Sequence, residues 1–219
     1  MHPWTTEHRA GDVGVFHARP LGEQRSATFF EVRFPTLVLG SSQSAESVDI
    51  EAAGRHGVDL ARRRSGGGGV LLWPGEHLWL DLEIPATDEL WSNDVGRAMW
   101  WVGELWQTAL TPFAPHATVH RGRLQRTQWS PAVCFAGVGP GEVLVGGAKL
   151  VGISQRRTRR AARFQTMVHL RWRPDVNAAL VAGPPAARPA TEDLAPLVAT
   201  CTAPAETITS SLMAALNQL

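Results

Sequence analysis

Polar and apolar residues alternate along residues 77–84, which is the pattern of a β-strand with one buried face. Leu78, Leu80 and Leu82 point to one side of such a strand, whereas Trp79 and Asp81 point to the other. Shorter apolar or β-branched runs predict further strands at 27–33, 36–39, 58–64, 70–73, 132–136, 142–145, 149–155 and 162–172. Strands therefore occupy most of the middle of the chain.

Helical spacing appears between and after these strands. The clearest helix follows Ser92-Asn93-Asp94, because apolar residues recur three and four positions apart as far as Leu110. A shorter helix is predicted from Ser47 to His56, with its end at Gly57, and short helices are expected over 175–219. Residues 1–26 show neither period and are expected to be irregular. The pattern predicts an α+β protein with a mixed, largely antiparallel sheet flanked by helices, and 1–219 is interpreted as a single domain.

Composition narrows the class of protein. The 219 residues are 44% hydrophobic and carry a net charge of +1, so no strong overall field favours nucleic acid or a membrane surface. The apolar runs are too short to span a bilayer, no signal pattern opens the chain, and Cys134 and Cys201 do not suggest a disulfide framework. We therefore expect a cytoplasmic protein with no nucleic-acid or membrane partner. The run from Arg156 to Arg163 is interpreted as a basic rim for an acidic protein or a nucleotide phosphate.

The chain contains 20 arginines but a single lysine, Lys149. Such a bias is typical of bacterial genes of high GC content, so a retained lysine stands out. A compact ammonium fits among phosphate or carboxylate oxygens where a broad guanidinium does not. Lys149 is therefore a candidate for direct contact with an anionic ligand.

A second candidate is the run Arg62-Arg63-Arg64-Ser65-Gly66-Gly67-Gly68-Gly69. Consecutive glycines leave backbone N–H groups open to a ligand, and the arginines before them supply forked donors for phosphate or carboxylate. A plain hairpin turn beside a solvated basic surface explains the run equally well. Phosphate-loop, dinucleotide-binding and Gly-x-Ser-x-Gly patterns are absent, and His116 with His120 has no further metal ligand, so no metal site is predicted.

Together, Arg63-Arg64-x-Gly66-Gly67-Gly68 and the segment from Gly147 to Arg157, with its Gly-x-Lys-x-x-Gly-x-x-Gln core, resemble the lipoate–protein ligase family of the biotin/lipoate ligase superfamily. The order of elements also matches over residues 27–172, including a Gln43-containing loop, a long helix and a Cys134-Phe135 strand. The resemblance implies a biotin/lipoate ligase-like fold of the class II synthetase type. It also implies activation of lipoate, or a similar short acid, with ATP and Mg²⁺, and transfer of the acyl group to a lysine of a lipoyl domain or H-protein.

The resemblance also assigns roles to residues. It makes Lys149 the catalytic residue that contacts the carboxylate and the α-phosphate. The ligand-binding residues that it implies are Arg63, Arg64, Ser65, Gly66, Gly67, Gly68, Gly152 and Gln155. On this basis Lys149→Ala is expected to abolish adenylate formation and leave the fold intact, and Gly67→Val is expected to block the ligand.

The sequence departs from the family pattern at four points, one of which is that the N-terminal helix common in the family is missing or much altered in residues 1–26. The positions after the glycines are Leu71-Leu72-Trp73-Pro74 instead of a polar pair, and Glu142 is a candidate substitute on the metal side for an Asn-Asp pair before Lys149. The chain is also too short for an accessory C-terminal domain, so a separate accessory subunit is a further candidate partner. These departures leave two alternatives open: an ATP-independent octanoyl or lipoyl transferase that uses Cys134, and a non-catalytic acyl- or nucleotide-binding module.

Overall fold

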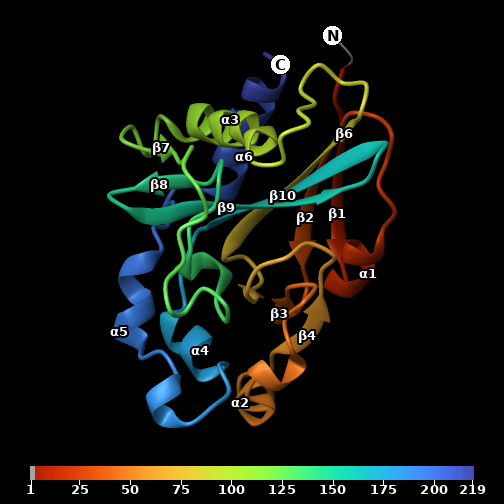
Figure 1. Ribbon diagram of the computed structural model, residues 1–219. Coiled ribbons are helices and arrows are strands. Elements are labelled where there is room, and N and C mark those ends of the chain that lie inside the picture. Colours follow the sequence, from red (N-terminus) through yellow and green to blue (C-terminus); the bar gives the residue numbers. More distant parts are fainter. Residues whose placement is uncertain (1–2) are drawn as a thin grey trace.

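The computed structural model describes residues 3–219, and its largest feature is a seven-stranded sheet (Figure 1). Its strands, in spatial order, are β1 (Thr5–Gly11), β2 (Ser26–Val32), β6 (His77–Pro85), β10 (Ala161–His169), β9 (Ala148–Arg157), β8 (Val143–Val145) and β7 (Thr118–Val119). The β1–β2 pair is parallel and every other neighbouring pair is antiparallel. The predicted mixed, largely antiparallel sheet is confirmed.

A second, three-stranded sheet lies below the large one in Figure 1. Its order is β4 (Asp59–Arg62), β3 (Thr36–Leu39) and β5 (Val70–Leu72), with β3 parallel to β4 and antiparallel to β5. The glycine run joins β4 to β5, so it leaves the small sheet at one edge and returns at the other.

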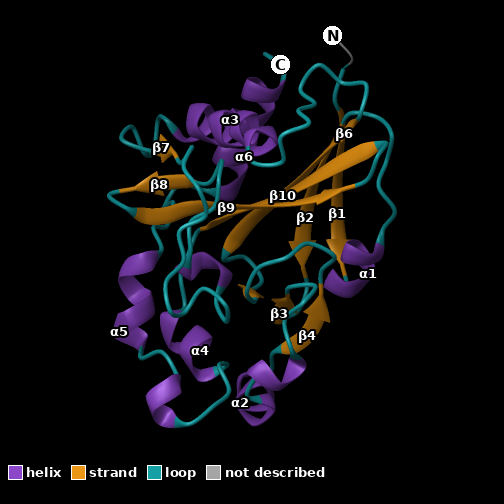
Figure 2. Ribbon diagram, in the orientation of Figure 1, coloured by secondary structure: helices purple, strands orange, loops and turns teal. Residues whose placement is uncertain are grey.

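Helices surround both sheets (Figure 2). The α-helices are α1 (Val13–Ala18), α2 (Ile50–His56), α3 (Trp100–Leu110), α4 (Pro174–Ala179), α5 (Thr191–Leu194) and α6 (Ala205–Leu216). Short 3₁₀ turns are η1 (Ala45–Ser47), η2 (Arg97–Met99), η3 (Cys134–Ala136), η4 (Pro185–Ala187) and η5 (Ala195–Leu197). As predicted, α2 ends at Gly57, which adopts the left-handed conformation (φ +62°) that glycine tolerates best. Within residues 3–219, no helix is both long and apolar enough to cross a membrane.

The main core lies between the large sheet and the pair α3 and α6. Leu80, Leu82 and Phe164 point from the sheet toward Trp106 of α3 and Leu212 of α6, and all five are almost fully buried. Each such side chain contributes about 1.5–3 kcal/mol relative to an exposed one. The opposite face of the large sheet covers the small sheet and α1, and the functional residues described below lie there.

Two predictions about secondary structure are wrong. Residues 1–26 are not irregular: Thr5–Gly11 forms an edge strand, and Asp12 caps α1 by accepting a hydrogen bond from the backbone N–H of Val15; residues 1 and 2 lie outside the described part. Residues 132–136 are not a strand, because their one β-type pairing is the isolated bridge between Val133 and Gly69, after which the chain turns into η3. A sequence period does not reveal an edge strand that is held by a parallel neighbour, so β1 was missed. Nor does it show whether a short apolar run finds neighbouring strands, so residues 132–136 were predicted as a strand although they have none.

Candidate functional site

A mainly apolar pocket lies between the two sheets; its empty volume is about 460 Å³, part of which is open to solvent. We call it the inter-sheet pocket. Val38 and Leu72 line it from the small sheet, Met167 and Gly152 line it from the large sheet, and Phe135 closes one side. A side chain at position 152 would not fit, because a Cβ there would lie 2.8 Å from the Phe135 ring. Gly152 thus leaves room beside that ring.

A larger cleft of about 1590 Å³ opens beside this pocket, and we call it the lysine cleft. Lys149, Gln155 and the turn Gly66–Gly68 all line it, so the structure brings together most of the residues singled out by the sequence. Cys134, Ile153 and Ser154 line both spaces. One elongated ligand could therefore occupy the pocket and the cleft at the same time.

Lys149 is almost fully buried where β9 begins. Its ammonium lies 2.7 Å from Glu142 Oε2, donates a hydrogen bond to the carbonyl oxygen of Cys134 at 3.0 Å, and sits 5.1 Å from the centre of the Phe135 ring. Two of its three N–H donors are thus engaged, which leaves one for a ligand. The Glu142 carboxylate also accepts hydrogen bonds from the backbone N–H groups of Gly139 and Ile153, so this buried charge is well solvated by the protein.

The glycine turn is tightly packed on its inner side. A Cβ at Gly68 would lie 2.6 Å from the carbonyl oxygen of Ser130, and Gly67 has φ +101°, which disfavours any side chain. Arg63 holds the turn from within by donating to the carbonyl oxygens of Val38, Gly66 and Gly68. The Nε of Arg63, which lines the inter-sheet pocket, is buried without a hydrogen-bond partner.

Gln155 and Ser65 take different places in the site. Both amide atoms of Gln155 are buried without a hydrogen-bond partner among residues 3–219, although the residue lines the lysine cleft. Unpaired buried amides are costly, so this side chain is suited to a ligand that completes its bonds. Ser65 is buried behind the turn, where its hydroxyl bonds to Ser154 at 3.1 Å and to Gln165 at 3.3 Å.

Arg64, like Ser65, lines neither the pocket nor the cleft. It lies in an open groove of about 900 Å³ with Arg156, Arg159 and Arg160, which we call the arginine groove. Glu23 also lines this groove and pairs with Arg160 at 3.1 Å. Burial, and next the Arg64 charge, lower the pKa of Arg156, which means that like charges face each other here.

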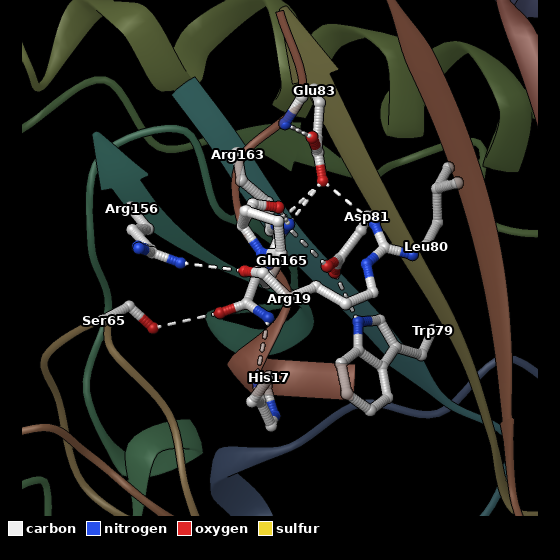
Figure 3. Close-up of polar contacts among 12 residues, drawn as sticks. His17, Arg19, Ser65, Trp79, Leu80, Asp81, Glu83, Arg156, Arg163 and Gln165 are labelled. Atoms are coloured by element: carbon white, nitrogen blue, oxygen red, sulfur yellow. Dashed lines mark hydrogen bonds and ion pairs between the residues drawn. The ribbon is translucent and has the colours of Figure 1, made fainter. Parts of the chain in front are cut away.

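Polar side chains continue the floor of the inter-sheet pocket in cross-strand rows (Figure 3). Register places Trp79 beside Met167, Asp81 beside Gln165, and Glu83 beside Arg163. On the far strand the same rows continue with Gly152, Ser154 and Arg156. The floor therefore changes from apolar to polar to charged within three rows.

Several groups in this region are perturbed by burial. Burial lowers the pKa of His17 and of His169 to about 3, with nearby cationic or histidine groups adding to the effect, so both rings are neutral. Both histidines contribute stability that is full above the ordinary pKa of 6.5 and is lost as the pH falls toward 3. Burial raises the pKa of Asp81 to about 7, which has the opposite sign: its contribution is full below pH 3.8 and is lost as the pH rises toward 7.

Cys134 stands where the pocket meets the cleft. It is only partly buried, and its Sγ lies 3.8 Å from Nη2 of Arg63. Its backbone N–H donates to the carbonyl oxygen of Gly69, which fixes it against the glycine turn. No group of three or more His, Cys, Asp or Glu side chains in residues 3–219 is arranged to hold a metal ion.

The two sheets, the pocket and the glycine turn define a ligase fold of the biotin and lipoate type. A profile of the lipoyl protein ligase A/B catalytic domain matches residues 8–179, and the chain belongs to this family.

Solved structures agree on the fold. A bipartite lipoate protein ligase from Thermoplasma acidophilum, described with its E2 lipoyl domain, matches with a TM-score of 0.74 at 16% identity over 100% of this chain and 84% of that one. A putative lipoate protein ligase from T. acidophilum with bound lipoic acid gives 0.71 at 16% identity over 99% and 84%. A lipoate-protein ligase A bound with ATP gives 0.69 at 17% identity over 99% and 84%. No curated protein sequence matches the chain.

Sequence reasoning missed His17 and Gln165, and it treated Cys134 as a residue on a neighbouring strand. Gln165 offered no distinctive signal, because Arg163 and His169 are further polar residues on the same face of its strand. His17 offered none, since its position in the site depends on α1, which the sequence did not predict.

Proposed function

We propose that this chain is an ATP-dependent ligase that activates lipoate or a similar short acid and transfers the acyl group to a lysine of a carrier protein. The observation that carries the proposal is the continuity of the inter-sheet pocket with the lysine cleft, where Lys149, Gln155 and the glycine turn add polar groups to a largely apolar lining. The tail of an acid fits the first space and a nucleotide the second. Residues 1–219 then act as one catalytic domain in the cytoplasm, which is consistent with the family profile over residues 8–179.

The roles of the individual residues follow from their positions. The remaining N–H donor of Lys149 would stabilise charge where a carboxylate oxygen attacks the α-phosphorus of ATP and pyrophosphate leaves; a fixed donor of this kind contributes about 10²–10³ in rate. The turn Gly66–Gly68 and the unpartnered amide of Gln155 would contact the nucleotide side of the acyl-adenylate. Gly152 keeps the path for the tail open beside Phe135.

Support for the substrates comes from related structures, which contain lipoic acid in one case and ATP in another. Mg²⁺ is less easily assigned to residues of this chain. Glu142 lines the cleft, but Lys149 and two backbone N–H groups already engage its oxygens, so the residue does not fit the role of a metal ligand. We therefore assign no step to Mg²⁺ through Glu142.

We further propose that the arginine groove receives an acidic face of the acceptor protein. One related structure is described as that of a bipartite lipoate protein ligase and its E2 lipoyl domain. Arg64 borders the groove, and the glycines that follow it in the sequence border the lysine cleft, so a partner in the groove would lie next to the activated acid. A separate accessory subunit is a further candidate partner in adenylation. The test is to assay adenylation with this chain alone, which we expect to be sufficient.

The position of Cys134 favours a second candidate, an ATP-independent acyl transferase. The thiol lies at the junction of the two spaces, 3.8 Å from a guanidinium nitrogen of Arg63. In that reaction the thiolate would attack the carbonyl of an acyl thioester, release the donor thiol, and then lose the acyl group to an acceptor lysine. A non-catalytic binding module would catalyse neither the ATP-dependent ligation nor the acyl transfer.

Acylation of a lipoyl domain should be measured with lipoate plus ATP and, separately, with an octanoyl thioester. A ligase requires ATP, releases pyrophosphate, and keeps its rate in Cys134→Ser. Cys201→Ser is the matched control, because Cys201 is buried in the core away from both spaces. Activity with the thioester alone that disappears in Cys134→Ser, but not in Cys201→Ser, would replace the ligase with the transferase. Ligand binding without either reaction would identify the chain as a non-catalytic binding module.

A further inference from the structure

The inner part of the inter-sheet pocket ends on polar side chains. His17, Trp79 and Gln165 line this pocket without lining the lysine cleft, so they lie on the side away from Lys149. His17 comes from α1, and its ring packs 4.9 Å from the ring of Trp79. Figure 3 shows Gln165 between Ser65 and His17. An acid whose carboxylate reaches Lys149 would therefore place its distal end near this group.

A directed chain of hydrogen bonds sets the state of His17. The Ser65 hydroxyl donates to Oε1 of Gln165, so the Gln165 amide nitrogen is the atom that faces Nδ1 of His17, at 2.9 Å. Nδ1 must then accept, and the single proton of a neutral imidazole lies on Nε2. Nε2 makes no hydrogen bond with residues 3–219, although it is not among the fully buried unpaired atoms and keeps some exposed surface. The ring stays neutral because burial and the nearby Arg63 and Arg163 charges lower its pKa to about 3.

A network of ion pairs fixes this arrangement. Glu83 pairs with Arg163 at 2.7 Å and with Arg19 at 3.0 Å, and Arg163 also donates to the carbonyl oxygen of Pro20. Arg156 donates to the carbonyl oxygen of Arg19. The end of α1 is thus tied to β6, β9 and β10 two residues after His17, and the imidazole cannot easily turn away from the pocket.

On this basis, and resting on the proposed function, we propose that the pocket selects an acid whose distal end carries a hydrogen-bond acceptor, which Nε2–H of His17 recognises. A plain hydrocarbon tail would bury this donor without a partner, whereas a distal carbonyl or ether oxygen would satisfy it. A ring sulfur, as in lipoate, is a weak acceptor and would fall between the two. We expect an acid with a distal oxygen to bind about 10–100-fold more tightly than its deoxy counterpart.

Direct binding of medium-chain keto acids, each with one carbonyl near the distal end, should be measured by calorimetry beside their deoxy counterparts. His17→Phe keeps an aromatic ring against Trp79 but removes both nitrogens, so it should weaken the best keto acid about 10–100-fold and leave its deoxy counterpart within about threefold. Met167→Leu, in the same pocket without a polar group, is the control and should not change the preference. Pyrophosphate release should be measured with the same acids. A binding preference for the keto acids without pyrophosphate release would contradict the ligase proposal and leave the His17 proposal standing.

Equal affinity of wild-type protein for keto and deoxy acids would overturn the assignment, whether or not the variant folds. So would an unchanged preference in folded His17→Phe. A preference for an acid with a distal ammonium group over the keto acid would also contradict it, because an ammonium can only donate a hydrogen bond and so can the proposed Nε2–H.

Discussion

Replacing Lys149 by methionine tests how one side chain serves both the fold and the reaction. The sequence suggested that removing this lysine would leave the fold intact, but its ammonium neutralises Glu142, which is buried. Breaking a buried ion pair by removing one partner costs about 3–5 kcal/mol. In a protein of 219 residues that amounts to a fall in melting temperature of about 6–20 °C. Lys149→Met should therefore be both inactive and clearly destabilised.

The double variant Lys149→Met/Glu142→Gln separates these effects. An uncharged amide at position 142 removes the stranded charge and can still accept from the N–H of Gly139 or of Ile153. We expect it to recover about half of the lost stability but none of the activity. Urea unfolding and acid-dependent pyrophosphate release, measured on the same preparations, provide the two readouts. A single variant as stable as the wild type would refute the buried pair. Restored activity in the double variant would refute a direct role for the ammonium.

Three further predictions concern the pocket, the groove and pH. Gly152→Val should lower affinity for the acid at least about tenfold in calorimetry, because the pocket wall has no room for a Cβ; unchanged affinity would place the tail elsewhere. Arg159→Glu should raise KM for a lipoyl-domain acceptor several-fold at low salt and leave acceptor-free pyrophosphate release unchanged. Exposed Arg33→Glu is its control, and an equal effect there would exclude docking in the groove. Between pH 6.5 and 4, unfolding takes up three protons, at His17, His77 and His169, and releases one from Asp81, so stability should fall by about 2.7 kcal/mol per pH unit. A flat urea-midpoint profile would show that these rings are charged in the folded state.

The sequence predicted the elements that carry strong local patterns. The alternation over residues 77–84 corresponds to β6, and the helical spacing before Leu110 corresponds to α3, although the α-helix begins only at Trp100 after a 3₁₀ turn. Gly57 ends α2 as expected. In α3 one face is buried against the sheet, so the local period and the tertiary packing agree, whereas β6 is buried on both faces and not on one as expected.

Other features depend on contacts that no local pattern records. Edge strand β1 is mostly exposed and takes its conformation from parallel pairing with β2, so its sequence has no buried alternation to detect. The motifs located Lys149 and the glycine turn correctly in one cleft but also included Arg64, whose side chain lies in the arginine groove. A run of adjacent arginines does not reveal which one points inward; here Arg63 does, because carbonyl oxygens of the small sheet and the turn receive its donors.

The central claim is that an acid lying between the two sheets is joined to a nucleotide beside Lys149. Its most direct test is a single-turnover reaction of the chain with lipoate and ATP, without acceptor or accessory protein, analysed by mass spectrometry. The account predicts enzyme-bound lipoyl-adenylate and an equal amount of pyrophosphate, with neither product formed by Lys149→Met/Glu142→Gln. Unchanged ATP and free lipoate in the presence of folded, acid-binding protein would contradict it.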